Sequence, residues 1–208
     1  MVRREDGEAT RKRLLEAACE IFANKGFHDG KVADICKRAG ANVAAVNYHF
    51  RNKANLYEEA WLHAFKKFKE PVFTDSAKDQ PEEQLRTHIQ TLIENFLEQD
   101  MPGHFSRLYL RELVNPTGII RDAWHKMIEP RRQKFLKIIR DVIGKKVDDE
   151  VVLFCELSIV NQCRLLLTID RGDLEHLLGE PLSPELIKRL VDHIASFSLA
   201  GIKAVTKT

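Results

Sequence analysis

Side chains that can hydrogen-bond to a nucleic acid gather in one short segment of this 208-residue chain. Asn42 and Asn47 carry amides that can pair with an adenine edge, and Val43 can contact a thymine methyl group. Tyr48 and His49 offer an O–H and a ring N–H, which suit the oxygens of a backbone phosphate. We therefore expect three side chains that recognise bases beside two that hold phosphates, although Asn42 fits a purely structural helix cap equally well.

The neighbouring residues predict a short helix that lies close against another surface. Gly40 ends the preceding helix, and the asparagine two residues later can cap the next one. Only Val46 and Phe50 are large apolar anchors, while the small Ala44 and Ala45 leave little bulk between them. A short helix with a polar, aromatic-bearing outer face is typical of the second helix of a helix-turn-helix, which enters a DNA groove.

Positive charge is concentrated around the same segment. Residues 1–70 hold 14 Lys and Arg against 10 Asp and Glu, a balance of +4, whereas residues 71–208 hold 19 against 21, a balance of −2. Within residues 25–53, two acidic residues stand against six basic ones, namely Lys25, Lys31, Lys37, Arg38, Arg51 and Lys53. A surface that binds DNA phosphates needs such an excess, and we expect Lys31 and Lys53 to contact them.

The elements that must position these residues are all helical. Apolar residues recur at helical spacing, and neither sustained alternation nor hairpin dipeptides indicate a strand. We expect about nine helices, over residues 10–25, 32–39, the segment ending at Phe50, 53–70, 81–97, 104–114, 119–143, 148–169 and 184–205. Pro130 falls inside the seventh and either kinks or divides it. The predicted domains are a helix-turn-helix unit (1–52), a connecting helix (53–71) and a larger domain (72–208).

The last two expected helices are apolar on more than one face. Residues 151–167 and 186–202 are rich in Leu, Ile, Val and Phe without a single polar side. A terminal helix of this kind is hard to surround within one subunit, so a partner is needed to cover it. We expect a homodimer in which these two helices of each subunit form a four-helix interface. The alternative is a helix that is fully buried in its own subunit.

A series of short motifs runs in order from Thr10 to Tyr57. They are Ala17-Ala18, Ile21-Phe22, Gly26-Phe27, Val32–Ile35, Arg38–Gly40, Asn47–Phe50, Lys53 and Leu56-Tyr57. In this combination and order they resemble TetR-family transcriptional regulators. The later segments are similar to the CecR-type branch of that family, through Leu110–Leu113, Asn115–Thr117, Ile128–Pro130 and Ile159–Cys163.

The resemblance implies a transcriptional repressor that binds double-stranded operator DNA as a homodimer. It also implies a small-molecule effector in each larger domain, which shifts the fourth helix and releases the operator. Two places depart from the family pattern. Gly30 and Lys31 stand where a capping Thr or Ser often opens the second helix, and Asn47 stands where many members carry Tyr. We therefore expect a base preference different from the common one.

Candidate residues for the effector cavity combine apolar and aromatic side chains with a few polar ones, as small-molecule sites usually do. They are Phe96, Met101, Phe105, Tyr109, Glu112, Trp124, Met127, Asn161 and Gln162. Each apolar candidate also fits an ordinary core position. The polar ones are more suggestive because polar groups inside apolar helices need partners, which an internal hydrogen-bonded network would also supply.

The remaining features exclude several classes of protein. The first residues are charged where a secretory signal needs an apolar run, and no apolar stretch reaches membrane-spanning length, so we expect a cytoplasmic protein without membrane contact. Four scattered cysteines predict buried thiols and no metal site, with a redox pair of Cys155 and Cys163 as the alternative.

Enzyme motifs are missing from the sequence. It contains no Gly-rich phosphate loop, no G-x-S-x-G and no H-E-x-x-H, so we expect neither an enzyme nor a cofactor. A second candidate function is a DNA-bound protein whose larger domain binds a protein partner instead of a small ligand.

Overall fold

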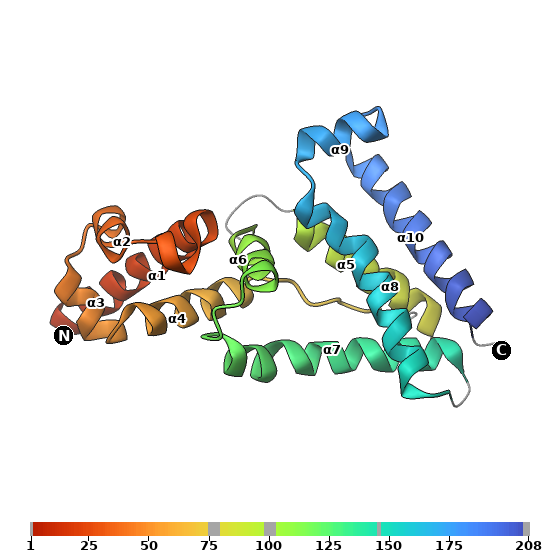
Figure 1. The fold of residues 1–208 in the computed structure, drawn as a ribbon, viewed down its shortest axis with the longest axis horizontal. Helices are drawn as coiled ribbons and strands as arrows, with labels where there is room; N and C mark the ends of the chain where they lie inside the picture. Colours follow the sequence, from red (N-terminus) through yellow and green to blue (C-terminus); the bar gives the residue numbers. More distant parts are fainter. Residues whose placement is uncertain (1, 75–79, 98–102, 145–146, 206–208) are drawn as a thin grey trace. The chain divides into compact units, whose positions relative to one another are not determined.

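The computed structural model describes residues 2–74, 80–97, 103–144 and 147–205, and over these it contains ten α-helices and no strand (Figure 1). The helices are α1 (Val2–Asp29), α2 (Val32–Ala39), α3 (Val43–Phe50), α4 (Lys53–Phe65), α5 (Pro81–Leu97), α6 (Gly103–Val114), α7 (Arg121–Ile143), α8 (Asp149–Thr168), α9 (Arg171–Leu178) and α10 (Pro184–Val205). The prediction of an all-helical protein is confirmed. α4 ends before the expected residue 70, and α7 is not divided at Pro130.

Backbone contacts divide the chain into two compact units. The first comprises Met1–Phe68 and Gln99–Lys126, and the second comprises Lys69–Glu98 and Met127–Thr208. The boundary between Lys126 of the first unit and Met127 of the second falls inside α7. Each unit has its own buried residues. The finer division at residues 52 and 71 stays a prediction.

The first unit is built around α1, which packs against α2, α4 and α6. Its largest fully buried side chains are aromatic, and they come from several helices: Phe22, Phe50, Tyr57, Trp61, Phe65 and Phe105. The rings of Trp61 and Phe65 are stacked, with centroids 5.7 Å apart, and Phe105 lies 5.0 Å from each of them. Aromatic contacts of this kind stabilise a core beyond the area that they bury.

The second unit packs α5, α8 and α10 together with the later part of α7. Its core consists of aliphatic residues at helical spacing, including Leu85, Ile89, Ile93, Ile139, Val152, Ile159, Val191 and Ile194. The short α9 was not expected from the sequence. The Asp170 carboxylate caps its start by accepting from the Gly172 N–H at 2.7 Å, and Gly179 ends it in the left-handed conformation.

α8 is apolar on two sides, as the sequence predicts. One side is buried in the core through Val152, Ile159 and Cys163, whereas Phe154 and Leu157 on another side are 58% and 55% exposed. Among the described helices, α8 alone has the length and composition of a membrane span, with a third of its apolar window buried. α8 therefore presents an apolar surface to solvent.

All four cysteines are buried free thiols. Burial raises the pKa of Cys163 to about 12 and also raises the pKa of Cys155. A raised pKa lowers the thiolate fraction on which thiol reactivity depends. The structure thus agrees with the prediction of buried thiols and gives no support to a redox pair.

Lowering the pH from about 7 to about 5 should destabilise the second unit through His88. The ring of His88 is stacked on Phe135 with centroids 4.0 Å apart, and its buried Nδ1 has no hydrogen-bond partner. Burial lowers the pKa of His88 from 6.5 to about 4. The unfolded chain therefore takes up a proton near its ordinary pKa, while the folded chain does not until the pH approaches 4.

The contribution of His88 is complete above its ordinary pKa and is lost as the pH falls towards the folded value. Urea unfolding of the parent protein and of His88→Leu, at about pH 7 and about pH 5, isolates it, because other groups titrate alike in both. We expect the parent to lose about 2 kcal/mol more than the variant. Equal losses in the two proteins would refute the assignment.

Candidate nucleic-acid interface

A tight turn joins α2 to α3 and sets their relative orientation. Gly40 adopts φ 60°, ψ 41°, a left-handed conformation that glycine takes without steric penalty. The N–H of Ala41 then donates to the carbonyl of Cys36 at 2.9 Å. Val46 and Phe50 are buried, as predicted, and they anchor α3 through its inner face. This is the helix-turn-helix arrangement that the sequence predicts.

The outer face of α3 presents the side chains expected to recognise bases. Val43 is 49% exposed and Asn47 is also exposed. Asn42 is exposed too, but its amide oxygen accepts from the Ala45 N–H at 2.9 Å, so the capping role is real. Asn47 is therefore the better placed of the two asparagines for a bidentate contact with adenine, which uses both amide atoms.

The two expected phosphate ligands on α3 differ in their exposure. Tyr48 is 83% exposed, whereas His49 is half-buried beside Phe50, with ring centroids 6.1 Å apart. The Tyr48 and His49 rings meet edge to face at 4.9 Å. Tyr48 is therefore the more accessible of the two to a phosphate.

The start of α2 explains one departure from the family pattern. A Cβ atom at Gly30 would lie 2.7 Å from the carbonyl oxygen of Gly26 and 2.7 Å from the Phe22 ring, so no larger residue fits. Lys31 therefore occupies the cap position, is exposed, and makes no side-chain cap bond. The exposed Lys31 thus lies at the N-terminus of α2, where an anion is stabilised.

Several basic residues of the segment 25–53 are engaged within the protein. The Lys53 ammonium donates to the His28 carbonyl at 3.1 Å and lies 4.8 Å from the centre of the Phe27 ring. Lys25 pairs with Asp34 at 2.8 Å, and Arg38 pairs with Glu20. The sequence alone does not reveal these contacts, because each joins residues from different helices. The direct phosphate contact expected of Lys53 therefore competes with its bond to α1.

Two neighbouring polar residues of α6 form hydrogen bonds with α1 and with α4. The Arg111 guanidinium donates to the carbonyl of Ala23 at 2.9 Å and also to that of Asn24. Both carbonyls lie just before Gly26, where the backbone of α1 leaves the helical conformation. The Glu112 carboxylate accepts from the Tyr57 hydroxyl of α4 at 2.7 Å. Glu112 was predicted as a ligand contact, with an internal hydrogen-bonded network as the alternative, and its bond to Tyr57 belongs to such a network.

The nine candidate pocket residues do not form one cluster within either unit. In the first unit, Phe105, Tyr109 and Trp124 belong to the aromatic core, with the Tyr109 and Trp124 rings stacked 5.4 Å apart. Met101 lies outside the described residues. Glu112 also belongs to the first unit, where it bonds to Tyr57. The second unit holds the remaining four, namely Phe96, Met127, Asn161 and Gln162. The effector site stays a prediction.

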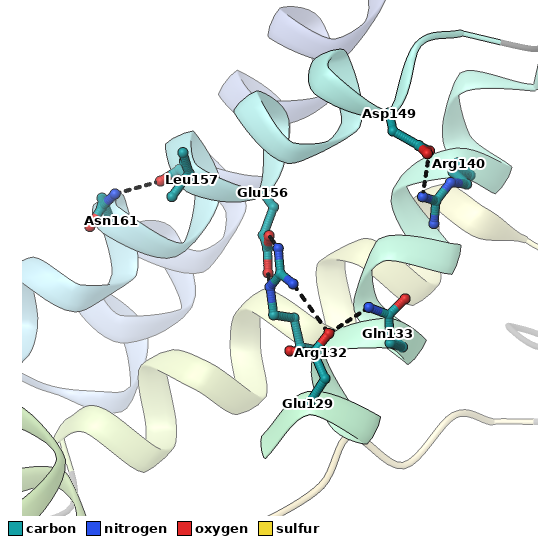
Figure 2. Close-up of polar contacts among 8 residues, drawn as sticks. All are labelled: Glu129, Arg132, Gln133, Arg140, Asp149, Glu156, Leu157 and Asn161. Atoms are coloured by element: carbon teal, nitrogen blue, oxygen red, sulfur yellow. Dashed lines mark hydrogen bonds and ion pairs between the residues drawn. The ribbon is translucent and has the colours of Figure 1, made fainter. Parts of the chain in front are cut away.

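Polar residues on α7 and α8 satisfy one another in the second unit (Figure 2). Arg132 makes a bidentate contact with Glu156, both N–O distances being 2.6 Å, and a longer one with Glu129. Asn161 is exposed, and its amide donates to the Leu157 carbonyl at 2.8 Å. The Arg132–Glu156 contact joins α7 to α8 and gives the buried Glu156 carboxylate the partner that it requires.

Gln162 lies elsewhere, in an apolar hollow between α8 and α10 that opens to solvent. The hollow is lined by residues from both helices, among them Phe154, Ile159, Phe197, Gly201 and Ile202. It continues the exposed apolar side of α8. Its lining is mostly apolar, with Ser158, Gln162 and Ser198 as the polar exceptions, so it suits an apolar group better than a charged ligand.

Comparison with known families covers most of the chain. Residues 14–60 match the family described as bacterial regulatory proteins, tetR family. Residues 81–202, more than half of the chain, match the family described as the C-terminal domain of the HTH-type transcriptional dual regulator CecR.

Individual relatives agree with both matches. The chain is 26% identical over 170 residues to the dual regulator CecR of Shigella flexneri, which covers 75% of this chain and 74% of that protein. It is 34% identical over 71 residues to the regulator UidR of Escherichia coli (strain K12), 32% of this chain and 36% of that protein. A TetR-family protein of Shewanella sp. PV-4 has the same fold, with a TM-score of 0.61 at 17% identity, over 93% of this chain and 95% of that one. The chain therefore belongs to the TetR family and is a DNA-binding transcriptional regulator with a CecR-type C-terminal domain.

Proposed function

We propose that this regulator is a homodimeric repressor that a small, largely apolar effector releases from a two-fold DNA operator. The exposure of the outer face of α3 is the main observation that supports DNA binding. Val46 and Phe50 are buried and anchor the helix in the core, while Val43, Asn47 and Tyr48 are exposed to solvent. These are the side-chain types that contact thymine methyls, adenine edges and phosphates.

Each side chain has a proposed share of the contact. Asn47 and Val43 contact base edges, and Asn42 adds its remaining amide protons while it caps α3. Tyr48, His49 and Lys31 contact phosphates. Lys53 acts mainly by tying the start of α4 to the end of α1, since its ammonium is bonded to the His28 carbonyl.

The dimer is proposed to form through α8 and α10. Family members bind operators and usually dimerise, and here both helices pack on the same core yet expose large apolar side chains. Covering these residues with the same face of a second copy gives an isologous interface. The two copies of α3 then contact half-sites about 34 Å apart, or a multiple of that distance.

Selection of DNA from a random duplex library, followed by footprinting, tests the proposal. We expect a palindromic site protected on two half-sites, and reduced transcription in vitro from a promoter that contains it. An organic extract of cells should contain a fraction that lowers the affinity for this site. Activation of transcription, or capture of a protein with no effect of any extract, would instead support a different regulator.

Replacing Asn47 with alanine should weaken discrimination at a single base pair of each half-site. Loss of a bidentate contact costs about 1–3 kcal/mol at that base pair and little at the others. Titration of the variant against operators mutated one base pair at a time measures the pattern. Lys31→Ala serves as the comparison, because loss of a phosphate contact weakens all operators alike. If both variants lose affinity evenly across the operators, Asn47 does not recognise a base.

A further inference from the structure

Arg51, in the turn between α3 and α4, is the one described residue other than glycine with a positive φ angle. Its backbone angles are φ 69°, ψ −48°. The N–H of Asn52 donates to the carbonyl of Phe50 at 2.9 Å, which closes a γ-turn around Arg51. A γ-turn with positive φ at its centre is strained for any residue that has a Cβ atom.

The turn itself does not require an arginine. Glycine adopts positive φ freely, and the described part of the chain places glycine at its other such positions: Gly26, Gly40, Gly118, Gly144 and Gly179. An arginine at position 51 therefore lowers the stability of the fold relative to a residue that relieves the strain. Strained non-glycine residues concentrate at functional sites, where the side chain has a use.

The Arg51 side chain is exposed and has no hydrogen bond, ion pair or ring contact with any described residue. Its basic neighbours differ in this respect. Lys53 is bonded to the His28 carbonyl, Lys25 to Asp34 and Arg38 to Glu20. The guanidinium of Arg51 thus keeps its full set of donors available for a partner outside the chain.

The position of Arg51 directly after the last residue of α3 indicates what that partner is. Its N–H donates to the Asn47 carbonyl at 3.0 Å, so it closes the last turn of the helix that carries Asn47 and Tyr48. A helix of eight residues is about 12 Å long. The major groove is about 12 Å wide, so a long side chain at the end of the helix reaches the DNA backbone.

We propose that Arg51 is a further DNA contact, whose guanidinium donates two hydrogen bonds to one backbone phosphate beside the groove that α3 enters. The proposal rests on the DNA-binding function proposed above. Arginine suits this role because its planar donors match two phosphate oxygens. The tight turn fixes the backbone of Arg51 at the end of α3, and the strain persists because the side chain is needed there.

Three substitutions separate the side chain from the strain. Arg51→Ala removes the guanidinium and keeps the strained Cβ, Arg51→Gly removes both, and Arg51→Lys keeps the charge. Binding to a mixed-sequence duplex of about 30 base pairs, three helical turns, is measured over a range of salt concentrations. We expect the alanine and glycine variants to bind roughly tenfold more weakly, and their salt slopes to fall by about 2, since a dimer loses two contacts.

Stability provides the second readout. Arg51→Gly should melt at a higher temperature than Arg51→Ala, by roughly 2–4 °C, although both lose the same affinity for DNA. Arg51→Lys should recover most of the salt slope, because a lysine still neutralises the phosphate. A residue with only a structural role would not give this combination of higher stability and weaker binding.

Lys137→Ala is the matched control, because it removes an exposed lysine of α7 whose one ion pair with a described residue is to Asp141. It should leave the salt slope unchanged. If the alanine and glycine variants bind with the parent slope, or if the lysine variant is as weak as they are, Arg51 does not contact a phosphate. If the parent protein itself binds no duplex at low salt, the DNA-binding proposal fails and not this inference alone.

Discussion

Replacing Phe197 with glutamate is expected to convert the dimer into a monomer and to lower affinity for a two-fold operator by about a hundredfold or more. Phe197 lies on α10 and is 62% exposed. It lines the apolar hollow shared with α8. In a two-fold interface every substitution occurs twice, so two carboxylates would have to be buried among apolar side chains. Burying unpaired charges in this way is strongly unfavourable.

The loss of DNA affinity follows from the loss of the dimer. When one α3 is bound, the second copy meets its half-site at an effective concentration in the millimolar range, which raises affinity by about 10²–10⁴. A monomer loses this factor although its own contacts with a half-site are intact. Affinity for a duplex that carries a single half-site should therefore change little, which separates dimerisation from damage to α3.

Sedimentation at micromolar concentration and operator titration together measure the effect. Leu157→Glu on α8 should behave in the same way, since Leu157 is 55% exposed. Val72→Glu is the control, because Val72 is 84% exposed and lies on neither helix. A Phe197→Glu protein that remains dimeric and binds its operator with parent affinity would rule out this face as the interface.

The fold could be predicted from the sequence wherever local rules decide it. α5 and α10 begin at the prolines expected to start them, Pro81 and Pro184, and α2 ends just before Gly40. Apolar residues at helical spacing predicted these helices, because a stripe at helical period must be covered. α9 was missed because Leu174 is its one buried residue, so no apolar stripe marks the helix in the sequence.

The candidate interface was predictable in its residue types but not in its contacts. The exposed side chains of α3 follow from the spacing of its anchors, Val46 and Phe50. The bond from Lys53 to α1, by contrast, joins residues 25 positions apart. The strained geometry of Arg51 also depends on how two helices meet. Neither leaves a mark on the local sequence pattern, so Arg51 was counted only as one of six basic residues, while Lys31 and Lys53 were expected to contact phosphates.

Replacing Glu112 with alanine should reduce the free energy of unfolding by about 2–4 kcal/mol, the second large effect that we expect. Glu112 is 7% exposed, and its carboxylate accepts from the Tyr57 hydroxyl at 2.7 Å and from the N–H and hydroxyl of Thr117 at 3.0 and 2.8 Å. Burial, and then the bond to Glu112, raise the pKa of Tyr57 above its ordinary range, so the phenol remains a donor. The substitution leaves these donors without an acceptor in a buried site. Such groups cost more when unpaired than the bonds contribute when made.

A double-mutant cycle distinguishes this network from a simple loss of packing. Tyr57→Phe removes one donor and leaves the Thr117 bonds in place, so it should cost only about 1 kcal/mol. In the Glu112→Ala background the same change should cost less, because the Tyr57 hydroxyl has already lost its acceptor, and the two effects should differ by about 0.5–3 kcal/mol. Glu94→Ala, which removes an exposed carboxylate of α5, should stay within about 0.5 kcal/mol of the parent. Additive costs for Tyr57 and Glu112 would show that α6 holds α4 by shape alone, and the carboxylate would then have no part in fixing the helix that supports α3.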